Sequence, residues 1–253
     1  MGSVAEESVK EKGEELHSMG SRKVIRYGPD KVIKSGNIDI SEADALKFVA
    51  DHTTIPVPRV HSVRTSEDPY KCEIIMDYIP GTRLDKAWQL FSHEQKVAVA
   101  TQLGGYISQL RKLKGTYIGG VNRGKVTVGR YKRIRCGPFD DEQQFNDYLL
   151  SLIAAKAPVT LRECATACVR DNHKITFAHG DLLPWNIIVD QGRITAIIDW
   201  EDAGWYPEYW EHYRALRILT PVDDWPEYFH YMFPCAYKEE YIGMSYLGII
   251  STS

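Results

Sequence analysis

The sequence predicts an α+β protein of two lobes, a small N-terminal lobe built on a β-sheet and a larger, mainly helical C-terminal lobe. Between Lys23 and Tyr78, short β-branched and aromatic runs alternate with turn residues around a single helical pattern. Beyond Gly81 the apolar residues take the spacing of helices. A length of 253 residues is sufficient for two such lobes. We therefore expect residues 1–78 to form the first lobe and residues 79–253 the second.

The composition favours an ordinary globular protein over a nucleic-acid or membrane protein. Hydrophobic residues make up 43% of the chain and charged residues 26%, which are ordinary values. A net charge of −3 argues against binding to nucleic acid or to anionic membranes. The sequence has no apolar run long enough to span a bilayer. Its five cysteines form no C-x-x-C pair, which favours reduced thiols and a cytoplasmic location. The composition does not indicate an oligomeric state.

The N-terminal lobe begins after a charged segment. Residues 1–15 are rich in Glu and Lys and read as a frayed helix or a disordered tail. A Gly-Pro-Asp turn then separates two expected strands, and Ser41 caps the helix, which ends before the prolines at 56 and 58. The strands expected in this lobe are 23–27, 31–34, 59–63 and 72–78.

A glycine-rich phosphate loop is not evident. The sequence has neither G-x-G-x-x-G nor the P-loop pattern G-x-x-x-x-G-K. Residues 18–21, Ser-Met-Gly-Ser, are the small polar stretch that could place backbone N–H groups over a phosphate. The same stretch could equally be a plain linker.

The C-terminal lobe contains several helical patterns. Ser92 and Gln95 form a capping box for a helix that reaches about Leu113. Further helices are expected at about 141–156 and 160–171, and in the latter Cys164 and Cys168 read as buried thiols rather than metal ligands. The basic segment 115–137 reads as a solvated loop rather than a nucleic-acid site. Another helix is expected to start at 205–211 with Pro207 in its first turn. There Trp210 and its neighbours read as core, although aromatic residues beside carboxylates can also form a cation cage.

Residues 177–201 combine a β-hairpin with three polar side chains. Two apolar β-branched runs, 187–189 and 194–198, flank a turn that contains Gly192. Asp181 and Asn186 precede the first run, and Asp199 follows the second. If Val189 pairs with Ile194, Asn186 lies opposite Ile197 and Asp199 lies opposite Pro184. The backbones of Asn186 and Asp199 would then lie about 8 Å apart at the open end of the hairpin. From there their side-chain oxygen atoms can bind one hard cation.

This stretch resembles the catalytic centre of the aminoglycoside phosphotransferase family, including its fungal members. The similarity is specific over residues 177–211, which contain the pattern H-G-D-x-x-x-x-N, the hairpin, Asp199 and the segment after it. In all, it covers roughly residues 22–218. The resemblance implies a two-lobed, protein-kinase-like fold and transfer of phosphate from ATP. It implies that Asp181 orients the acceptor hydroxyl, that Asn186 and Asp199 bind Mg²⁺, and that His179 supports the loop.

The same resemblance implies where the nucleotide binds. Lys34, at the end of a strand, would hold the phosphates and pair with Glu42 on the following helix, with Lys31 as the alternative lysine. The strand that ends at Pro80-Gly81 resembles the segment that joins the two lobes. There the Asp77 carbonyl and the Ile79 N–H would bind adenine, with Met76 against the ring. ATP is therefore expected in the cleft between the two lobes.

The resulting hypothesis is a small-molecule phosphotransferase whose acceptor carries a hydroxyl group, a cationic acceptor being one option. A protein kinase is disfavoured because only a few residues separate Asp199 from the segment around Pro207, which leaves no room for a peptide-binding segment. A non-catalytic nucleotide-binding relative is the main alternative, supported by the weak phosphate loop and opposed by the intact Asp181, Asn186 and Asp199. A metal-dependent phosphohydrolase could use the same carboxylates. Such an enzyme would give Lys34 and Glu42 no role, which argues against it.

Overall fold

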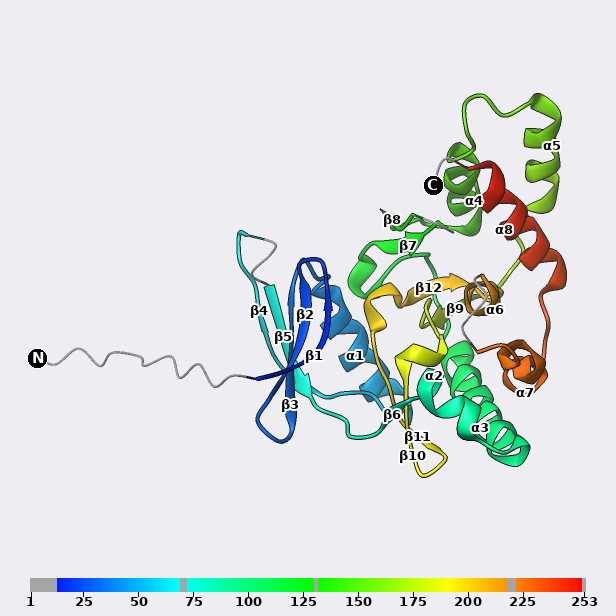
Figure 1. The fold of residues 1–253 in the computed structure, drawn as a ribbon. Helices are drawn as coiled ribbons and strands as arrows, with labels where there is room; N and C mark the ends of the chain where they lie inside the picture. Colours follow the sequence, from blue (N-terminus) through cyan, green and yellow to red (C-terminus); the bar gives the residue numbers. More distant parts are fainter. Residues whose placement is uncertain (1–12, 69–71, 130–131, 218–221, 252–253) are drawn as a thin grey trace, which may run out of the picture. The chain divides into compact units, whose positions relative to one another are not determined.

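The computed structural model describes residues 13–68, 72–129, 132–217 and 222–251. These residues form two compact units (Figure 1). The first unit holds residues up to Ile40 together with Arg59–Ile79, and the second holds Ser41–Pro58 together with Pro80–Ser253. No helix in the described residues is both long enough and apolar enough to cross a membrane.

The described residues of the first unit form one antiparallel sheet of five strands in the order β1-β2-β3-β5-β4. Its strands are β1 (Glu14–Met19), β2 (Arg22–Tyr27), β3 (Lys31–Gly36), β4 (Val60–Arg64) and β5 (Cys72–Asp77). β3 and β5 lie inside the sheet, and alternate residues of each are buried. Burial on one face follows from the two-residue period of a strand, which places Val32 and Lys34 on the same face of β3.

Strand β1 was not predicted, because residues 1–15 were read as a frayed helix or a disordered tail. All six of its residues are exposed, so the strand lacks the apolar alternation by which strands are recognised in a sequence. The rest of the predicted tail, residues 1–12, lies outside the described residues. The predicted phosphate loop, residues 18–21, contains the turn at Gly20 and Ser21 that joins β1 to β2. It is therefore a hairpin turn rather than a linker.

The second unit combines helices with short sheets. Its helices are α1 (Ser41–His52), α2 (Leu84–Ala87), α3 (His93–Lys112), α4 (Glu142–Ser151), α5 (Val159–Cys168), α6 (Trp210–Leu216), α7 (Phe229–Met232) and α8 (Lys238–Ile250). The 3₁₀ turns are η2 (Trp88–Leu90), η3 (Val121–Arg123), η4 (Pro184–Asn186), η5 (Trp200–Asp202) and η6 (Trp225–Tyr228). The predicted capping box is confirmed, because the Ser92 side chain accepts from Gln95 N–H and the Gln95 side chain accepts from Ser92 N–H.

The described part of the second unit also contains three small antiparallel sheets. They are built from β6 (Thr82–Arg83), β7 (Val126–Val128), β8 (Ile134–Cys136), β9 (Ile175–Ala178), β10 (Ile187–Asp190), β11 (Arg193–Ile197) and β12 (Gly204–Pro207). The sheet orders are β11-β10-β6, β12-β9 and β7-β8. Strand β9 leads into the loop that carries Asp181, and β10 and β11 form the predicted hairpin.

Helix α1 packs within the second unit, although the predicted lobe boundary placed it in the first. The Phe48 ring lies 4.9 Å from the ring of Phe177 on β9 and 5.6 Å from the ring of Trp205 on β12. The helix also packs against η5, which directly follows Asp199. These contacts bring the start of α1 to the segment that carries the candidate metal ligands.

Several predicted elements of the second unit need correction. Residues 204–207 form strand β12, paired with β9, so α6 begins at Trp210 and Pro207 precedes it. Trp210 itself is buried core, stacked on Tyr206. Cys164 and Cys168 are exposed rather than buried, because α5 buries only Ala165. α4 and α5 are also shorter than predicted.

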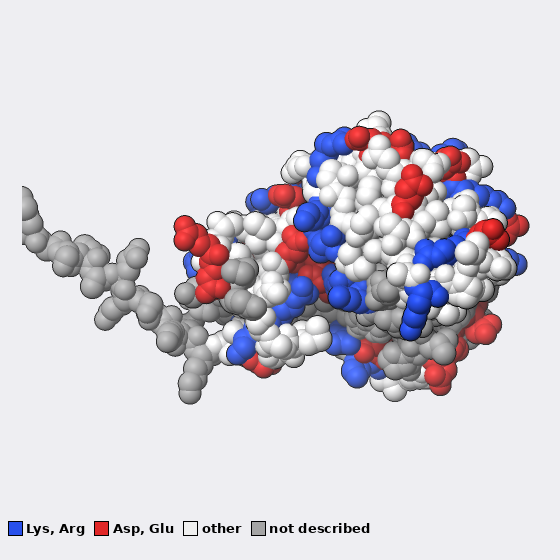
Figure 2. All heavy atoms as spheres, turned by 90° about the horizontal axis from the view of Figure 1, so that it is seen from above, with Lys and Arg blue, Asp and Glu red and all other residues white. Residues whose placement is uncertain are grey.

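The basic segment at 115–137 is not a solvated loop throughout. It contains β7, β8 and η3, and Arg133 and Arg135 bond to acidic or carbonyl groups of η5. Arg123 pairs with Asp140 at the surface, whereas Arg130 lies outside the described residues. Basic and acidic side chains are interspersed on the face of the molecule shown in Figure 2.

His173 joins three elements and makes stability depend on pH. Its ring Nδ1 lies 2.7 Å from Glu142 on α4, its Nε2 lies 3.4 Å from Glu240 on α8, and its ring packs against Tyr209. Burial lowers the pKa of His173, but the hydrogen bonds and charges of the two glutamates outweigh burial and raise it above 6.5. The imidazolium therefore stabilises the fold fully below pH 6.5, and this contribution is lost as pH rises through the folded-state pKa.

We expect His173→Gln to destabilise the protein by about 1–3 kcal/mol at pH 5.5–6, the cost of leaving a buried charged group without its partner. The loss should shrink as pH rises towards 9. Urea unfolding of both proteins across this range checks the expectation. A destabilisation that stays constant with pH would show that the ring acts only by packing.

Candidate active site

Asp181 lies in a tight loop between β9 and β10 and is closely tied to Asn186. The Asn186 amide nitrogen donates to the Asp181 backbone carbonyl at 2.9 Å and to its carboxylate Oδ2 at 3.0 Å. Both residues are buried, with 8% and 4% of their surface exposed. Because the amide nitrogen faces Asp181, the amide oxygen of Asn186 is the atom that can bind a cation.

The hairpin brings Asn186 and Asp199 into a register different from the predicted one. Val189 pairs with Ile194 as predicted, but a bulge shifts the register so that Ile187 pairs with Ile197. The Ile198 N–H then donates to the Asn186 carbonyl at 2.9 Å. Asn186 therefore lies opposite Ile198 rather than Ile197, which brings it one residue closer to Asp199 along the partner strand. Bulges that reorient side chains are common beside active sites.

Asp199 has an uncommon backbone conformation. Its φ of 64° and ψ of 61° lie in the left-handed region, which aspartate tolerates better than most side chains. The chain then turns directly into η5. Residues held in this region are enriched at functional sites, where the surrounding structure supports the strain.

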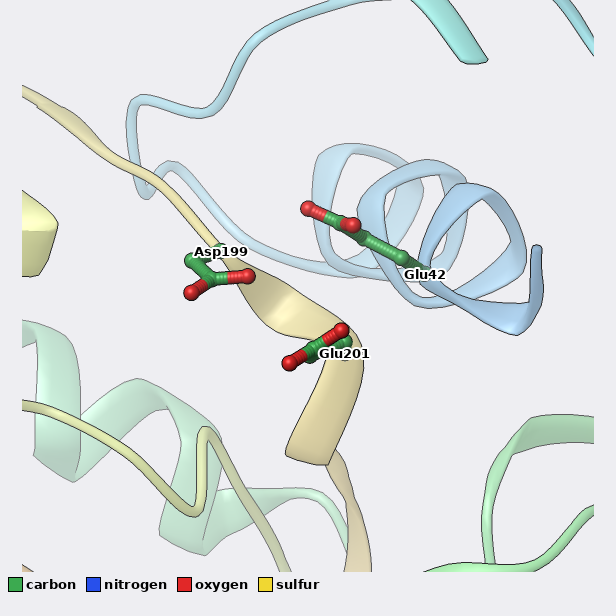
Figure 3. A group of neighbouring side chains, drawn as sticks. All are labelled: Glu42, Asp199 and Glu201. Carbon is green, nitrogen blue, oxygen red and sulfur yellow. The ribbon is translucent and has the colours of Figure 1, made fainter. Parts of the chain in front are cut away.

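Three carboxylates gather at this turn. Oxygen atoms of Glu42, Asp199 and Glu201 all lie within 4.8 Å of one another. Figure 3 shows Glu42 projecting from α1 towards the segment that carries the other two. Like charges this close repel unless cations offset them. Arg133 supplies positive charge here, because its Nη2 lies 2.8 Å from Glu201 and 2.5 Å from Asp202.

Helix α6 and the residue that follows it hold the Asp181 loop through three side chains spaced three residues apart. Glu211 accepts from the backbone N–H of His179 at 2.5 Å and of Gly180 at 3.3 Å. Arg214 donates to the Gly180 carbonyl at 2.7 Å, and Arg217 donates to the Asp181 carboxylate at 2.6 Å.

Two of these residues, Glu211 and Arg214, are buried. Burial raises the pKa of Glu211, although its bonds to the loop oppose the rise. Arg214 also bonds Asp202 at 3.1 Å, so its buried guanidinium has a carboxylate partner. A buried charge of this kind needs such a partner to offset the loss of water.

His179 forms hydrogen bonds on both sides of its ring, to the Asp181 loop and to Ile198. The Asp181 backbone N–H can only donate, so His179 Nδ1, 3.1 Å away, accepts from it. The proton is then on Nε2, which lies 3.1 Å from the Ile198 carbonyl. The ring therefore links the Asp181 loop to the end of β11.

The structure places the predicted nucleotide residues in the first unit, apart from Glu42. Lys34 lies on the buried face of β3 with 8% exposed, whereas Lys31 lies on the opposite face. Met76 and Asp77 end β5, and the Asp77 carboxylate binds His61 at 2.6 Å. Ile79 ends the first unit. The pairing of Lys34 with Glu42 and the adenine contacts stay predictions.

Sequence reasoning missed five residues of the site. They are Glu201, Asp202, Glu211, Arg214 and Arg217. A signal for the last three existed, since their spacing of three residues on an expected helix places them on one face. Nothing in the sequence indicated that this face would meet the Asp181 loop.

Gly180 allows the loop to approach η5. Its φ is +78°, and a Cβ atom placed there would lie 2.6 Å from the Asp202 carbonyl oxygen. We expect Gly180→Ala to cost at least about 1–2 kcal/mol, the penalty of a left-handed backbone with a side chain. Denaturant unfolding measures the change. Gly105→Ala in α3 is the control, because a Cβ atom there has no neighbour within 4 Å apart from the backbone of its own helix. This substitution should stabilise the helix by about 0.5–1 kcal/mol. Equal effects of the two substitutions would contradict the steric argument.

Comparison with known proteins connects this geometry to a family. The model of a family described as the phosphotransferase enzyme family matches residues 40–233. No curated protein sequence gives a significant match.

Solved structures of aminoglycoside phosphotransferases have the same fold. APH(4)-Ia is 15% identical, with a TM-score of 0.65 over 92% of this chain and 82% of that one. Aminoglycoside 2'-phosphotransferase-IIIa, in its GDP complex, is 14% identical, with a TM-score of 0.62 over 93% and 81%. APH(2")-IIa in its gentamicin complex is 15% identical, with a TM-score of 0.58 over 90% and 78%. The predicted α+β, protein-kinase-like fold is confirmed.

Proposed function

Because the chain belongs to the phosphotransferase enzyme family, we propose that it transfers the γ-phosphate of ATP to a hydroxyl group of a small molecule. The observation that carries the proposal is the Asp181–Asn186 pair. One carboxylate is held by an amide whose oxygen can bind a cation, and Asp199 follows the partner strand of the same hairpin.

In this proposal Asp181 receives the acceptor hydroxyl. The acceptor oxygen forms a bond to the γ-phosphorus, the bond from that phosphorus to the bridging oxygen breaks, and its electron pair leaves with ADP. The hydroxyl proton passes to Asp181. The transition state of such transfers is loose, so positioning and charge neutralisation contribute more than strong basicity. The bonds from Asn186 and Arg217 to the carboxylate favour positioning.

The donor set at Asp199 fits Mg²⁺, which the family implies. Carboxylate and amide oxygens are hard ligands, and the close approach of Glu42, Asp199 and Glu201 concentrates negative charge that a divalent cation offsets. Asp199 and Asn186 would hold the ion. When bound, it would neutralise charge on the nucleotide phosphates.

Two further groups are proposed to bind the nucleotide. Lys34 would hold the phosphates. Its position on the buried face of β3 makes it the better candidate than Lys31, which lies on the opposite face. The Asp77 carbonyl and the Ile79 N–H would pair with the base, with Met76 against the ring. The Asp77 carboxylate is already bound to His61, which is consistent with the use of backbone groups there.

The acceptor is proposed to be a small hydroxyl compound. Structures of related fold include APH(4)-Ia with hygromycin B and either ADP or AMP-PNP. At 13–14% identity these ligands do not identify the acceptor of this chain. Aminoglycosides, amino alcohols and sugars are therefore the classes to test.

The test is transfer from γ-labelled ATP, and separately GTP, to a panel of these classes. We expect Mg²⁺-dependent labelling of one class and more nucleotide consumption when that acceptor is present. Equal consumption with every compound and with none would indicate a hydrolase. Nucleotide binding without any consumption would indicate a non-catalytic relative.

A further inference from the structure

The loop that carries Asp181 brings no positive charge of its own. Leu182, Leu183, Pro184 and Trp185 separate Asp181 from Asn186, and both leucines are buried, at 3% and 0% exposed. Phosphoryl transfer spreads negative charge over the oxygens of the moving group, which cations stabilise. A cation on the acceptor side must therefore come from another element.

Arg217 is such a cation. It follows the last residue of α6, and its Nη2 lies 2.6 Å from Asp181 Oδ1. The other carboxylate oxygen, Oδ2, accepts from Asn186. Asp181 is thus held at both oxygens, on one side by an amide and on the other by a guanidinium.

The guanidinium is held in place and is shielded from water. Its Nη1 donates to the Arg214 carbonyl at 3.1 Å, and the side chain is only 13% exposed. Burial and the neighbouring Arg214 lower the pKa of Arg217, while Asp181 raises it. An arginine nevertheless stays protonated in proteins, so the charge is present at neutral pH.

The acceptor oxygen must lie within hydrogen-bond reach of Asp181, about 2.6–3.2 Å. A guanidinium bonded to the same carboxylate is then within a few ångströms of the oxygen that attacks phosphorus. At that range, in a site shielded from water, its charge acts on the transferring group. Arg214 contributes less, because its guanidinium is occupied by Asp202 and the carbonyls of Gly180 and Gly129.

We propose that Arg217 is the acceptor-side cation of the reaction, which orients Asp181 and stabilises the charge that develops on the transferring phosphoryl group. This inference rests on the proposed transferase function. It assigns to the end of α6 a role that complements the metal side of the site.

The experiment compares Arg217→Met and Arg217→Lys with Arg170→Met, a control that removes an exposed arginine paired with Glu239. The measurements are kcat, the KM for ATP and the acceptor, and the affinity for the transition-state mimic ADP–Mg²⁺–aluminium fluoride. We expect Arg217→Met to lower kcat by about 10²-fold or more, as loss of a transition-state charge donor does, with the KM for ATP within about threefold. Affinity for the mimic should fall with kcat, and added guanidinium at millimolar concentration should restore part of the rate.

Arg217→Lys keeps the charge but loses the planar fork of the guanidinium, so its kcat should lie between those of wild type and Arg217→Met and more than about threefold below wild type. It serves as the test if the methionine variant does not fold. The inference is overturned if either folded variant keeps kcat within about threefold of wild type, or if only the KM for the acceptor changes. Failure of the wild-type protein to label any acceptor would instead overturn the transferase function itself. The wild-type measurement thus separates the two failures.

Discussion

Replacing Asp181 by asparagine is expected to lower kcat by about 10²- to 10⁴-fold, the contribution of a positioned acid–base group. Asparagine keeps the shape of the side chain but cannot take the hydroxyl proton. The affinity for ATP should stay nearly unchanged, because the acceptor carboxylate is not a proposed ligand of the nucleotide or the metal. Single-turnover transfer and calorimetric titration with ATP measure the two quantities.

Asp190→Asn is the matched control, because Asp190 is exposed at the far end of the same hairpin. It should leave both quantities unchanged. If Asp181→Asn retains normal transfer, the acceptor role of Asp181 is wrong. If it loses ATP affinity and rate together, Asp181 belongs to the metal side instead.

Replacing Asp199 by asparagine should reduce both transfer and Mg²⁺-dependent nucleotide binding. Asparagine tolerates the left-handed backbone of this position, so the substitution isolates the charge. We expect nucleotide affinity in Mg²⁺ to fall by at least about 10- to 100-fold, since loss of even an outer-shell partner has such an effect on metal binding. Nucleotide affinity in EDTA should not change.

The contrast between the two substitutions tests whether Asp181 serves the acceptor and Asp199 the metal. Calorimetry with and without Mg²⁺ separates them, because only Asp199→Asn should abolish the effect of the metal on binding. An unaltered Mg²⁺ response in Asp199→Asn would move the metal to other carboxylates, of which Glu42 and Glu201 are the candidates.

The β10–β11 hairpin shows which features could be predicted from the sequence and which could not. Its β-branched runs, its turn and the pairing of Val189 with Ile194 were predictable, because they depend on local preferences and the two-residue period of strands. The bulge was not, because one extra residue leaves no clear trace in an apolar run. The prediction therefore misplaced Asn186 by one residue relative to the partner strand.

The sequence by itself determined the fold class, the capping box of α3 and the three polar residues Asp181, Asn186 and Asp199. The capping box and the three polar residues each depend on a local pattern, and the fold class follows from the order of such patterns along the chain. Only the tertiary structure decided what surrounds them. Glu42 on α1 meets Asp199 and Glu201 because α1 packs on η5, and Arg217 meets Asp181 because α6 lies along the loop. Such contacts join residues far apart in the chain through packing, which a single sequence does not encode in any local pattern.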